Sequence, residues 1–363
     1  MEKRNIIVIG ASSGGFEALK TLAANLPADL DASIFIVWHM AADVRGILPQ
    51  VLTRFGRIGA VEAHEGEKIE RNRIYVARPD HHLLIDEGRV RITRGPKENR
   101  FRPAIDPLFR SAAREYGNRV TGVILTGSLD DGSAGLWTVK SRGGVAVVQD
   151  PWDAEVPAMP ENAIRAVNVD HVVPLAEMAD LLVRLSQEEV PAEANMQVNK
   201  EEKEKTDVEI QIAAQDSAFE MGVMKLGKLS PFTCPDCHGV LSILKDGKFE
   251  RYRCHTGHAY SPDTLLATVT ETIEEDMWNT IRNVEESVML LNHLGDHFAE
   301  MNKGKLAAAY FAKANEAMGR IKLLREAVLS HETLSIDNIE TDAGEKSDVR
   351  SGGNGGSPAN APA

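Results

Sequence analysis

Three short segments among the first 131 residues contain side chains that could take part in catalysis. Each lies at or just after the end of an apolar run. Residues 10–14, GASSG, fit the pattern G-x-S-x-G, in which glycines permit a sharp turn that exposes the hydroxyl of Ser12. His39 ends the run SIFIVWH, and Asp130 and Asp131 lie in the loop after the run VTGVIL. Serine, histidine and aspartate are the components of an acyl-transfer triad, which is recognised by the roles of its members and not by their order.

Each segment also has a plainer interpretation. A dinucleotide-binding loop would need glycine where Ser12 stands and an acid where His39 stands, so that alternative is disfavoured. Taken alone, the glycine motif is compatible with a small-residue turn that packs a helix onto a strand. A single histidine at a strand end and an Asp-Asp-Gly loop are also most often structural. It is the combination that favours a triad.

A second group of reactive residues includes every cysteine of the chain. They fall within 21 residues in the spacing C-x2-C-x16-C-x3-H, formed by Cys234, Cys237, Cys254 and His258. This spacing suits tetrahedral Zn²⁺ held by three thiolates and one imidazole, and residues 240–253 between the ligand pairs have the pattern of a β-hairpin. We therefore expect a zinc ribbon whose metal is structural, because four protein ligands leave no open position. His238 and His255 are less well placed by spacing, and three unrelated reduced cysteines are the competing interpretation.

The elements that must position Ser12, His39 and the loop with Asp130 and Asp131 alternate between strand and helix over residues 1–186. Expected strands are 5–10, 33–39, 73–76, 89–94, 119–125, 145–149 and 171–174. Expected helices are 15–25, 48–54, 104–116, 133–142, 161–166 and 175–186. Continuous apolar strands are typical of burial on both faces, which predicts an α/β fold with a doubly wound, mostly parallel sheet. In such sheets catalytic groups gather at the carboxyl ends of the strands.

At this point residues 4–186 resemble a known family, the chemotaxis-type protein-glutamate methylesterases. The resemblance rests on six ordered matches: 9–15 (IGASSGG), 39–40 (HM), 77–82 (ARPDHH), 102–109 (RPAIDPLF), 125–132 (LTGSLDDG) and 156–164 (VPAMPENAI). It implies a serine hydrolase that removes methyl esters from glutamate side chains of chemoreceptor-like proteins, with deamidation of glutamine as related chemistry and no cofactor for catalysis. Relatives of this kind are similar in carrying a zinc module after the catalytic domain.

Carried over by motif, the resemblance implies Ser12 as nucleophile, His39 as base and Asp131 as the acid that orients it, with Asp130 a variable neighbour. The main-chain N–H of Ser13 is expected to hold the oxyanion. The family usually reads Gly-Met-Gly at residues 127–129, where this chain reads Gly-Ser-Leu, so Ser128 occupies a position whose main chain is expected to help. Of the histidines at 81 and 82, the family motif matches the second, and we expect a structural role for it.

Beyond the catalytic domain (1–186), composition predicts an acidic linker (187–222), the zinc ribbon (223–262), a helical hairpin (263–336) and a disordered tail (337–363). Residues 187–209 hold eight acids and three bases, and residues 337–363 hold five acids and two bases, which is typical of solvated segments. Apolar residues recur every three or four positions through 266–291 and 306–328, the pattern of two packed helices. Core packing or self-association is the default interpretation of this pattern, and docking to a receptor or signalling partner is the alternative.

Charge and hydropathy restrict the partners. The 363-residue chain has a formal charge of −13, which disfavours nucleic acid, and no apolar segment long enough for an ordinary transmembrane helix. Few cysteines and the absence of a secretory pattern favour a cytoplasmic protein. The family's usual receiver does not precede the domain, so we expect a switch other than receiver phosphorylation. The alternative function is a signalling scaffold with a degenerate esterase domain that binds partners through the ribbon and helices.

Overall fold

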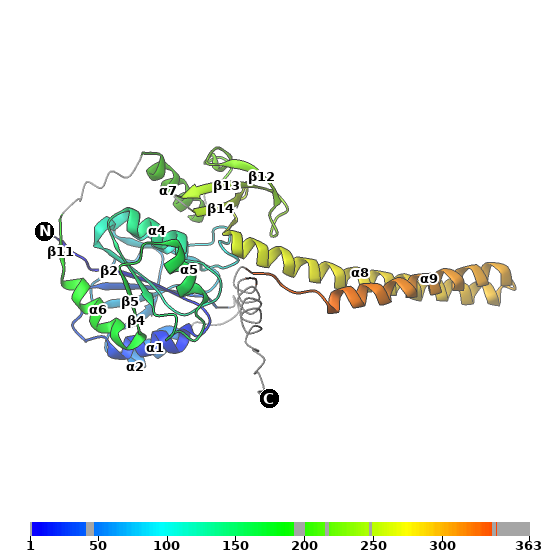
Figure 1. Cartoon of the computed structure of the whole chain (residues 1–363), viewed down its shortest axis with the longest axis horizontal. Coiled ribbons are helices and arrows are strands. Elements are labelled where there is room, and N and C mark those ends of the chain that lie inside the picture. Colours follow the sequence, from blue (N-terminus) through cyan, green and yellow to red (C-terminus); the bar gives the residue numbers. More distant parts are fainter. Residues whose placement is uncertain are drawn as a thin grey trace, which may run out of the picture. The chain divides into compact units, whose positions relative to one another are not determined.

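The computed structural model describes residues 2–40, 47–191, 200–214, 218–246, 249–335 and 339. It divides into two compact units, residues 1–265 and residues 266–363. The first unit contains the α/β domain and the ribbon, and the second contains most of a helical hairpin (Figure 1).

The α/β domain is built on a seven-stranded sheet in which every neighbouring pair of strands is parallel. The order across the sheet is β10 (His171–Val173), β9 (Val145–Gln149), β8 (Val120–Ile124), β2 (Ile6–Ala11), β3 (Ser33–Trp38), β5 (Arg73–Val76) and β4 (Ala60–Glu62). The chain builds outward from β2 first through β3 and later through β8. The crevice where the order reverses therefore lies beside β2, the usual ligand position in such sheets.

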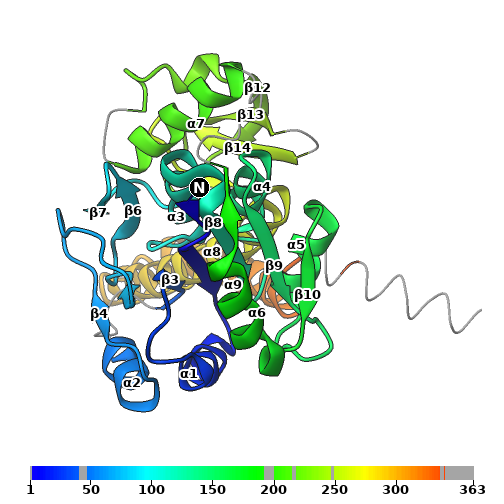
Figure 2. The same ribbon diagram turned by 90° about the vertical axis from the view of Figure 1, so that its left-hand side faces the viewer.

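Helices cover both faces of this sheet (Figure 2). One face packs against α1 (Gly15–Asn25), α2 (Leu48–Phe55) and α6 (Leu175–Gln187), and the other against α3 (Ile105–Tyr116), α4 (Ser133–Ser141) and α5 (Ala158–Ala166). Along β2, Ile7 and Ile9 enter the first core while Ile6 and Val8 enter the second. Because successive side chains of a strand alternate between faces, only a continuous apolar run can fill both cores. The predicted doubly wound α/β fold is confirmed.

The sequence patterns missed several short elements. Residues 89–94, expected as a strand, lie outside the parallel sheet as β7 (Arg89–Thr93), paired antiparallel with β6 (His82–Asp86). Two very short strands, β1 (Glu2–Lys3) and β11 (Glu189–Val190), also pair with each other, and a single 3-10 turn, η1 (Gly117–Arg119), precedes β8. These pieces are too short to show a period in sequence.

The ribbon is a four-stranded antiparallel sheet in the order β12 (Lys228–Thr233), β13 (Val240–Asp246), β14 (Phe249–Cys254) and β15 (Ala259–Tyr260), preceded by the 3-10 turn η2 (Val223–Lys225). The predicted hairpin is therefore β13 and β14. Its small core consists of Cys234, Leu241, Cys254, Tyr260 and Leu265. A core of this size is small for independent stability, and such domains usually need a metal or disulfides.

The prediction of a solvated linker over 187–222 is wrong for its middle part. Residues 200–213 form helix α7, which buries Glu209, Ile210, Ile212 and Ala213. The excess of acids in this segment comes mainly from exposed or half-buried positions in the first two turns, whereas the last turn is apolar on its inner side. The net charge of the segment did not reveal this buried apolar face of the helix. Part of the predicted linker and almost all of the predicted tail lie outside the described residues.

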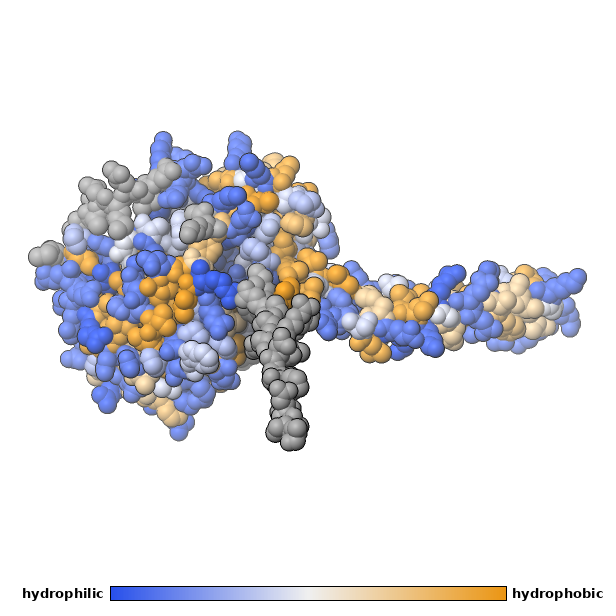
Figure 3. Space-filling view, in the orientation of Figure 1, coloured by the Kyte–Doolittle hydropathy of each residue, from blue (hydrophilic) through white to orange (hydrophobic). Residues whose placement is uncertain are grey.

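The hairpin consists of α8 (Pro262–Glu300) and α9 (Gly304–Leu329), which run side by side (Figure 1). Ile281 and Val288 of α8 pack against Ala314, Ile321 and Val328 of α9. The three- and four-residue spacing seen in sequence is thus the contact stripe between the helices. Hydrophobic side chains also appear among the hydrophilic ones on the visible face of the hairpin (Figure 3). In the part of the chain that the structure describes, no helix has the length and apolar character to cross a bilayer.

Candidate active site and metal site

Ser12, His39 and Asp131 come together at one edge of the parallel sheet. Ser12 directly follows β2, His39 directly follows β3, and Asp131 lies in the loop between β8 and α4. Because β2 pairs with β3 on one side and β8 on the other, their carboxyl ends bring the three residues into one place. The fold thus assembles Ser12 and His39, predicted from their types and positions, with Asp131, the acid that the family resemblance implied.

The imidazole of His39 connects the other two side chains. Its Nδ1 lies 3.1 Å from the Oγ of Ser12, and its Nε2 lies 2.8 Å from Oδ2 of Asp131. A carboxylate can only accept a hydrogen bond, so Nε2 carries the hydrogen and Nδ1 is left with a free lone pair. That lone pair faces the serine hydroxyl. The arrangement can therefore remove the hydroxyl proton of Ser12.

Asp131 is held in place by three donors besides His39. The main-chain N–H of Ile105, at the start of α3, donates to Oδ2 at 2.7 Å, and that of Asp106 lies 3.5 Å from Oδ1. The side-chain amide of Asn99 donates to Oδ1 at 3.0 Å. A helix N-terminus favours negative charge, which suits an ionised carboxylate here. Burial, followed by the charge of Asp131, raises the pKa of the neighbouring Asp106 to about 7.

The turn that carries Ser12 is fixed by hydrogen bonds to its main chain. The N–H of Ser12 donates to the carbonyl of Thr126 at 3.0 Å, and the indole N–H of Trp38 donates to the carbonyl of Ser12 at 3.0 Å. Gly14 has a φ of 74°, a left-handed conformation that glycine adopts without strain and that lets α1 begin at the next residue. Among the described residues, no hydrogen bond uses the main-chain N–H of Ser13 or of Ser128.

The unusual Ser128-Leu129 pair lies beside this turn. The hydroxyl of Ser128 is 3.4 Å from that of Ser13, so the two loops are adjacent. Leu129 has a φ of 62°, a left-handed conformation that costs a side-chain-bearing residue about 1–2 kcal/mol. Its carbonyl accepts a hydrogen bond from the amide of Asn162 at 3.0 Å. The loop thus keeps a conformation suited to glycine although leucine occupies the position.

A cavity of ≈ 650 Å³ opens at the serine. Aromatic side chains of Phe16, Trp38 and Phe101 form part of its lining, together with the basic residues Lys97, Arg100 and Arg102. Phe101 stacks on the ring of His39, with centroids 3.6 Å apart and planes inclined by 9°. Sequence reasoning missed Phe101 and Asn99 as site residues. Their one signal in the sequence is that Phe101 directly precedes the matched motif at 102–109 and Asn99 lies three residues before it.

The neighbouring candidates have other partners. Asp130, next to Asp131, accepts hydrogen bonds from the hydroxyls of Ser261 and Thr264 and does not contact His39. His82 is fully buried; its Nε2–H donates to the carbonyl of Pro96, and its Nδ1 accepts from the N–H of Ala104. Burial lowers the pKa of His82, which favours the neutral ring. Both ring nitrogens of His82 are thus bonded to main-chain groups, which is in keeping with the structural role expected for it.

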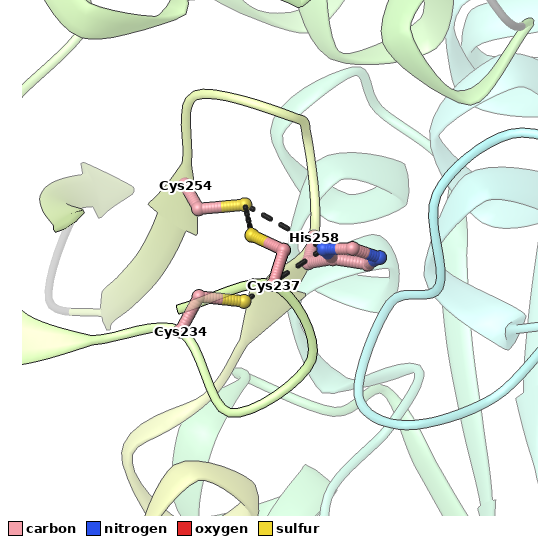
Figure 4. A group of neighbouring side chains, drawn as sticks. All are labelled: Cys234, Cys237, Cys254 and His258. Carbon is pink, nitrogen blue, oxygen red and sulfur yellow. Dashed lines mark hydrogen bonds between the residues drawn. The ribbon is translucent and has the colours of Figure 1, made fainter. Parts of the chain in front are cut away.

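The four predicted metal ligands also converge (Figure 4). Cys234 and Cys237 come from the turn between β12 and β13, Cys254 ends β14, and His258 follows in the next turn. All four donor atoms lie within 4.8 Å of one another. His238 and His255, the alternatives left open by spacing, are not in the group. These three cysteines and one histidine could hold a metal ion.

The distances within this group fit a tetrahedral ion. The Sγ atoms of Cys237 and Cys254 are 3.6 Å apart, and Nδ1 of His258 lies 3.7 Å from Sγ of Cys234 and 3.6 Å from Sγ of Cys254. Thiolates about 2.3 Å from a tetrahedral Zn²⁺ would be separated by about 3.8 Å. The donor set of three sulfurs and one nitrogen is a usual one for structural zinc.

Comparison with known proteins covers the N-terminal half of the chain. Residues 7–182 match the family model described as CheB methylesterase. A Leptospira interrogans protein, provisionally named a protein-glutamate methylesterase/protein-glutamine glutaminase, is 43% identical over 182 residues, which are 50% of this chain and 94% of that protein. A protein-glutamate methylesterase/protein-glutamine glutaminase of Anaeromyxobacter dehalogenans is 38% identical over 50% of this chain and 53% of its own length. The CheB methylesterase catalytic domain of Thermotoga maritima is 32% identical, with a TM-score of 0.48 over 50% of this chain and 98% of that one.

Proposed function

The chain belongs to the CheB methylesterase family, and we propose that it is a protein-glutamate methylesterase that acts on a chemoreceptor-like signalling protein through Ser12, His39 and Asp131. One observation carries the proposal: the hydrogen-bonded series from Ser12 through His39 to Asp131 at the mouth of an open cavity. The names of the relatives supply the substituted side chain, a glutamate or glutamine of a protein, and the triad supplies the chemistry. The chemoreceptor-like substrate comes from the family resemblance.

In the first half of the reaction, Oγ of Ser12 attacks the carbonyl carbon of a glutamyl γ-methyl ester while Nδ1 of His39 takes the hydroxyl proton. Asp131 stabilises the imidazolium that forms and keeps its ring oriented. The oxyanion of the tetrahedral intermediate is held by the main-chain N–H of Ser13, and the loop amide of Ser128 adds a second donor. His39 then returns the proton to the leaving oxygen, and methanol departs.

In the second half, water takes the place of the serine hydroxyl. His39 removes a proton from the water, the hydroxide attacks the acyl carbon, and Ser12 leaves with the proton restored. The product is a glutamate side chain. The same steps on a glutamine side chain would release ammonia in place of methanol, in keeping with the glutaminase part of the relatives' names.

We also infer that Zn²⁺ is the ion held by Cys234, Cys237, Cys254 and His258. The sulfur-rich donor set excludes the hard ions Mg²⁺ and Ca²⁺, which prefer oxygen. With four protein ligands the ion would have a structural role. Cysteines that form no disulfide also suit a reducing, cytoplasmic setting.

Covalent labelling of Ser12 distinguishes an enzyme from a scaffold with a degenerate site. A fluorophosphonate reagent reacts with a serine only where a base activates it, so the full chain should gain one adduct, located on Ser12 by peptide mass spectrometry. Ser12→Ala and His39→Ala should not react, and Ser330→Ala, which removes an exposed hydroxyl directly after α9, should react like the wild type. A wild-type protein that stays unlabelled, while a known serine hydrolase reacts in parallel, would favour the scaffold.

A further inference from the structure

The ribbon and α7 are joined to the α/β domain by buried charges. Arg253 of β14 donates to Glu98 at 2.9 Å and to Glu209 of α7 at 3.2 Å, while Arg110 of α3 also donates to Glu98. Arg251 donates to Glu209 at 2.8 Å. Removing one partner of such a buried set leaves an uncompensated buried charge, which is strongly destabilising. The set therefore fixes one relative position of ribbon and domain.

The charge on Glu98 depends on both sides of this contact. Burial raises its pKa, but the guanidinium groups of Arg110 and Arg253 outweigh burial and lower the pKa to about 2. The contact is also close at the main chain, because a Cβ on Gly95 would lie 2.4 Å from the carbonyl oxygen of Ala213 at the end of α7. The segment 95–98 thus lies directly against α7 and the ribbon.

The residue after Glu98 connects this contact to the candidate active site. The main-chain N–H of Asn99 donates to the carbonyl of Ala259 at 2.8 Å, and its side-chain Oδ1 accepts the N–H of Ser261 at 2.9 Å. Its Nδ2 donates to Asp131 at 3.0 Å and to Asp106 at 3.1 Å. The partners settle the orientation of the amide, because the N–H of Ser261 needs an acceptor and the carboxylates need donors.

Asn99 therefore contacts the ribbon through its main-chain N–H and its side-chain Oδ1. Its Nδ2 contacts Asp131, the acid that orients His39. The path is short, because Ala259 directly follows His258, one of the four converging metal-site residues. Asn99 itself is 4% exposed, so water does not replace these partners. A second contact runs parallel to the first: the hydroxyls of Ser261 and Thr264 hold Asp130 at 2.6 and 3.1 Å.

We propose that Asn99 is a positioning residue for Asp131, and that the end of the ribbon, residues 259–261, sets its position. The ribbon is then part of the support of the active site as well as a separate module. This inference rests on the proposed function, since positioning Asp131 matters for rate only if His39 acts as the base.

The test compares two identical substitutions in the full chain. Asn99→Asp keeps the acceptor for Ser261 and loses the donor to Asp131, and aspartate tolerates the φ of 48° at this position. Asn72→Asp is the matched control, because Asn72 has a φ of 56° and its amide donates to the carbonyl of Ala28, away from the triad. We expect Asn99→Asp to lower kcat for methanol release from a methyl-esterified receptor at least tenfold with KM unchanged, and Asn72→Asp to match the wild type.

Two further readouts separate positioning from a general loss of structure. The ratio of Asn99→Asp activity to wild-type activity should rise as pH falls, because the introduced carboxyl group can donate a hydrogen bond again once it is protonated. Arg253→Lys, which cannot bridge Glu98 and the carbonyl of Gly257 together, should lower kcat in the wild type and little further in Asn99→Asp.

Folding of each variant is checked by its melting temperature, and the comparison of Asn99→Asp with Asn72→Asp decides the positioning role even if Arg253→Lys does not fold. A folded Asn99→Asp protein with kcat within twofold of the wild type, while Ser12→Ala is inactive, would overturn the inference and leave the proposed function standing. If the losses of kcat from Arg253→Lys and Asn99→Asp multiply in the double variant, the claim that the ribbon positions Asn99 would be refuted. Ester hydrolysis that survives Ser12→Ala would instead refute the proposed function.

Discussion

At the scale of single residues, His39 can serve as a base only while its Nδ1 lacks hydrogen, and Asp131 secures that state by accepting from Nε2 at 2.8 Å. Residue types at strand ends were enough to predict Ser12, His39 and an acid at 130 or 131, because parallel strands bring their carboxyl ends to one edge. The choice of Asp131 over Asp130 came from the family resemblance. Asn99 and Phe101 could not be predicted, because they act through a loop whose path depends on distant contacts. The φ of 62° at Leu129 also has no signal in a single sequence.

Asp130 gives a pH test of the loop beside the triad. Burial, the largest influence, raises the pKa of Asp130 from about 3.8 to about 7, and Asp263 and Asp131 add to this although the hydroxyls of Ser261 and Thr264 oppose it. The folded protein therefore binds a proton between about pH 4 and pH 7 that the unfolded chain does not bind. Asp130 contributes stability at low pH that is lost as pH rises through 7, with a slope of at most about 1.4 kcal/mol per pH unit.

Asp130→Asn cannot titrate, so its free energy of unfolding should rise relative to the wild type between pH 5 and pH 8. Urea denaturation at intervals of one pH unit measures this difference. Asp29→Asn, which also removes one carboxyl group but at an exposed position, is the matched control for the loss of a charge. A flat difference for Asp130→Asn would mean that this carboxyl does not titrate in the folded protein between pH 5 and pH 8.

At the scale of elements, apolar runs and three- and four-residue spacing predicted the main strands of the parallel sheet and the positions of its helices. The pattern failed for α7, because its acids outnumber its bases while its last turn is apolar and packs against α3. It also failed for β4 and β6, which are three and five residues long. In both cases the deciding interaction is a tertiary contact, which local composition does not record.

The ribbon gives the metal test. The protein purified in reducing buffer should contain one Zn²⁺ per chain by elemental analysis, and His258→Ala should lose zinc and lower the free energy of unfolding. His255→Ala is the matched control, because the imidazole of His255 lies near the cluster in sequence but outside it in the fold. Freshly purified protein without metal, or equal zinc content in the two variants, would remove the zinc assignment.

At the scale of the whole molecule, the net charge of −13 is uneven, and part of the acidic segment at 187–209 is folded as α7. The ribbon's attachment depends on pairs such as Glu98 and Arg253, 155 residues apart in sequence, so no local pattern could predict it. The hairpin exposes Met289, Leu290 and Leu323 along its length, and self-association or docking to a signalling partner stays a proposal for it. The α/β domain, by contrast, was predictable, because the apolar periodicity that gives its strands and helices places the reactive residues at the ends of those strands.

Release of methanol from methylated receptor fractions tests the central claim most directly. The wild-type chain should release methanol in step with new glutamate carboxylates on the receptor, and Ser12→Ala, with an unchanged melting temperature, should release none above the uncatalysed rate. Methanol release by Ser12→Ala at a rate close to that of the wild type would contradict the account.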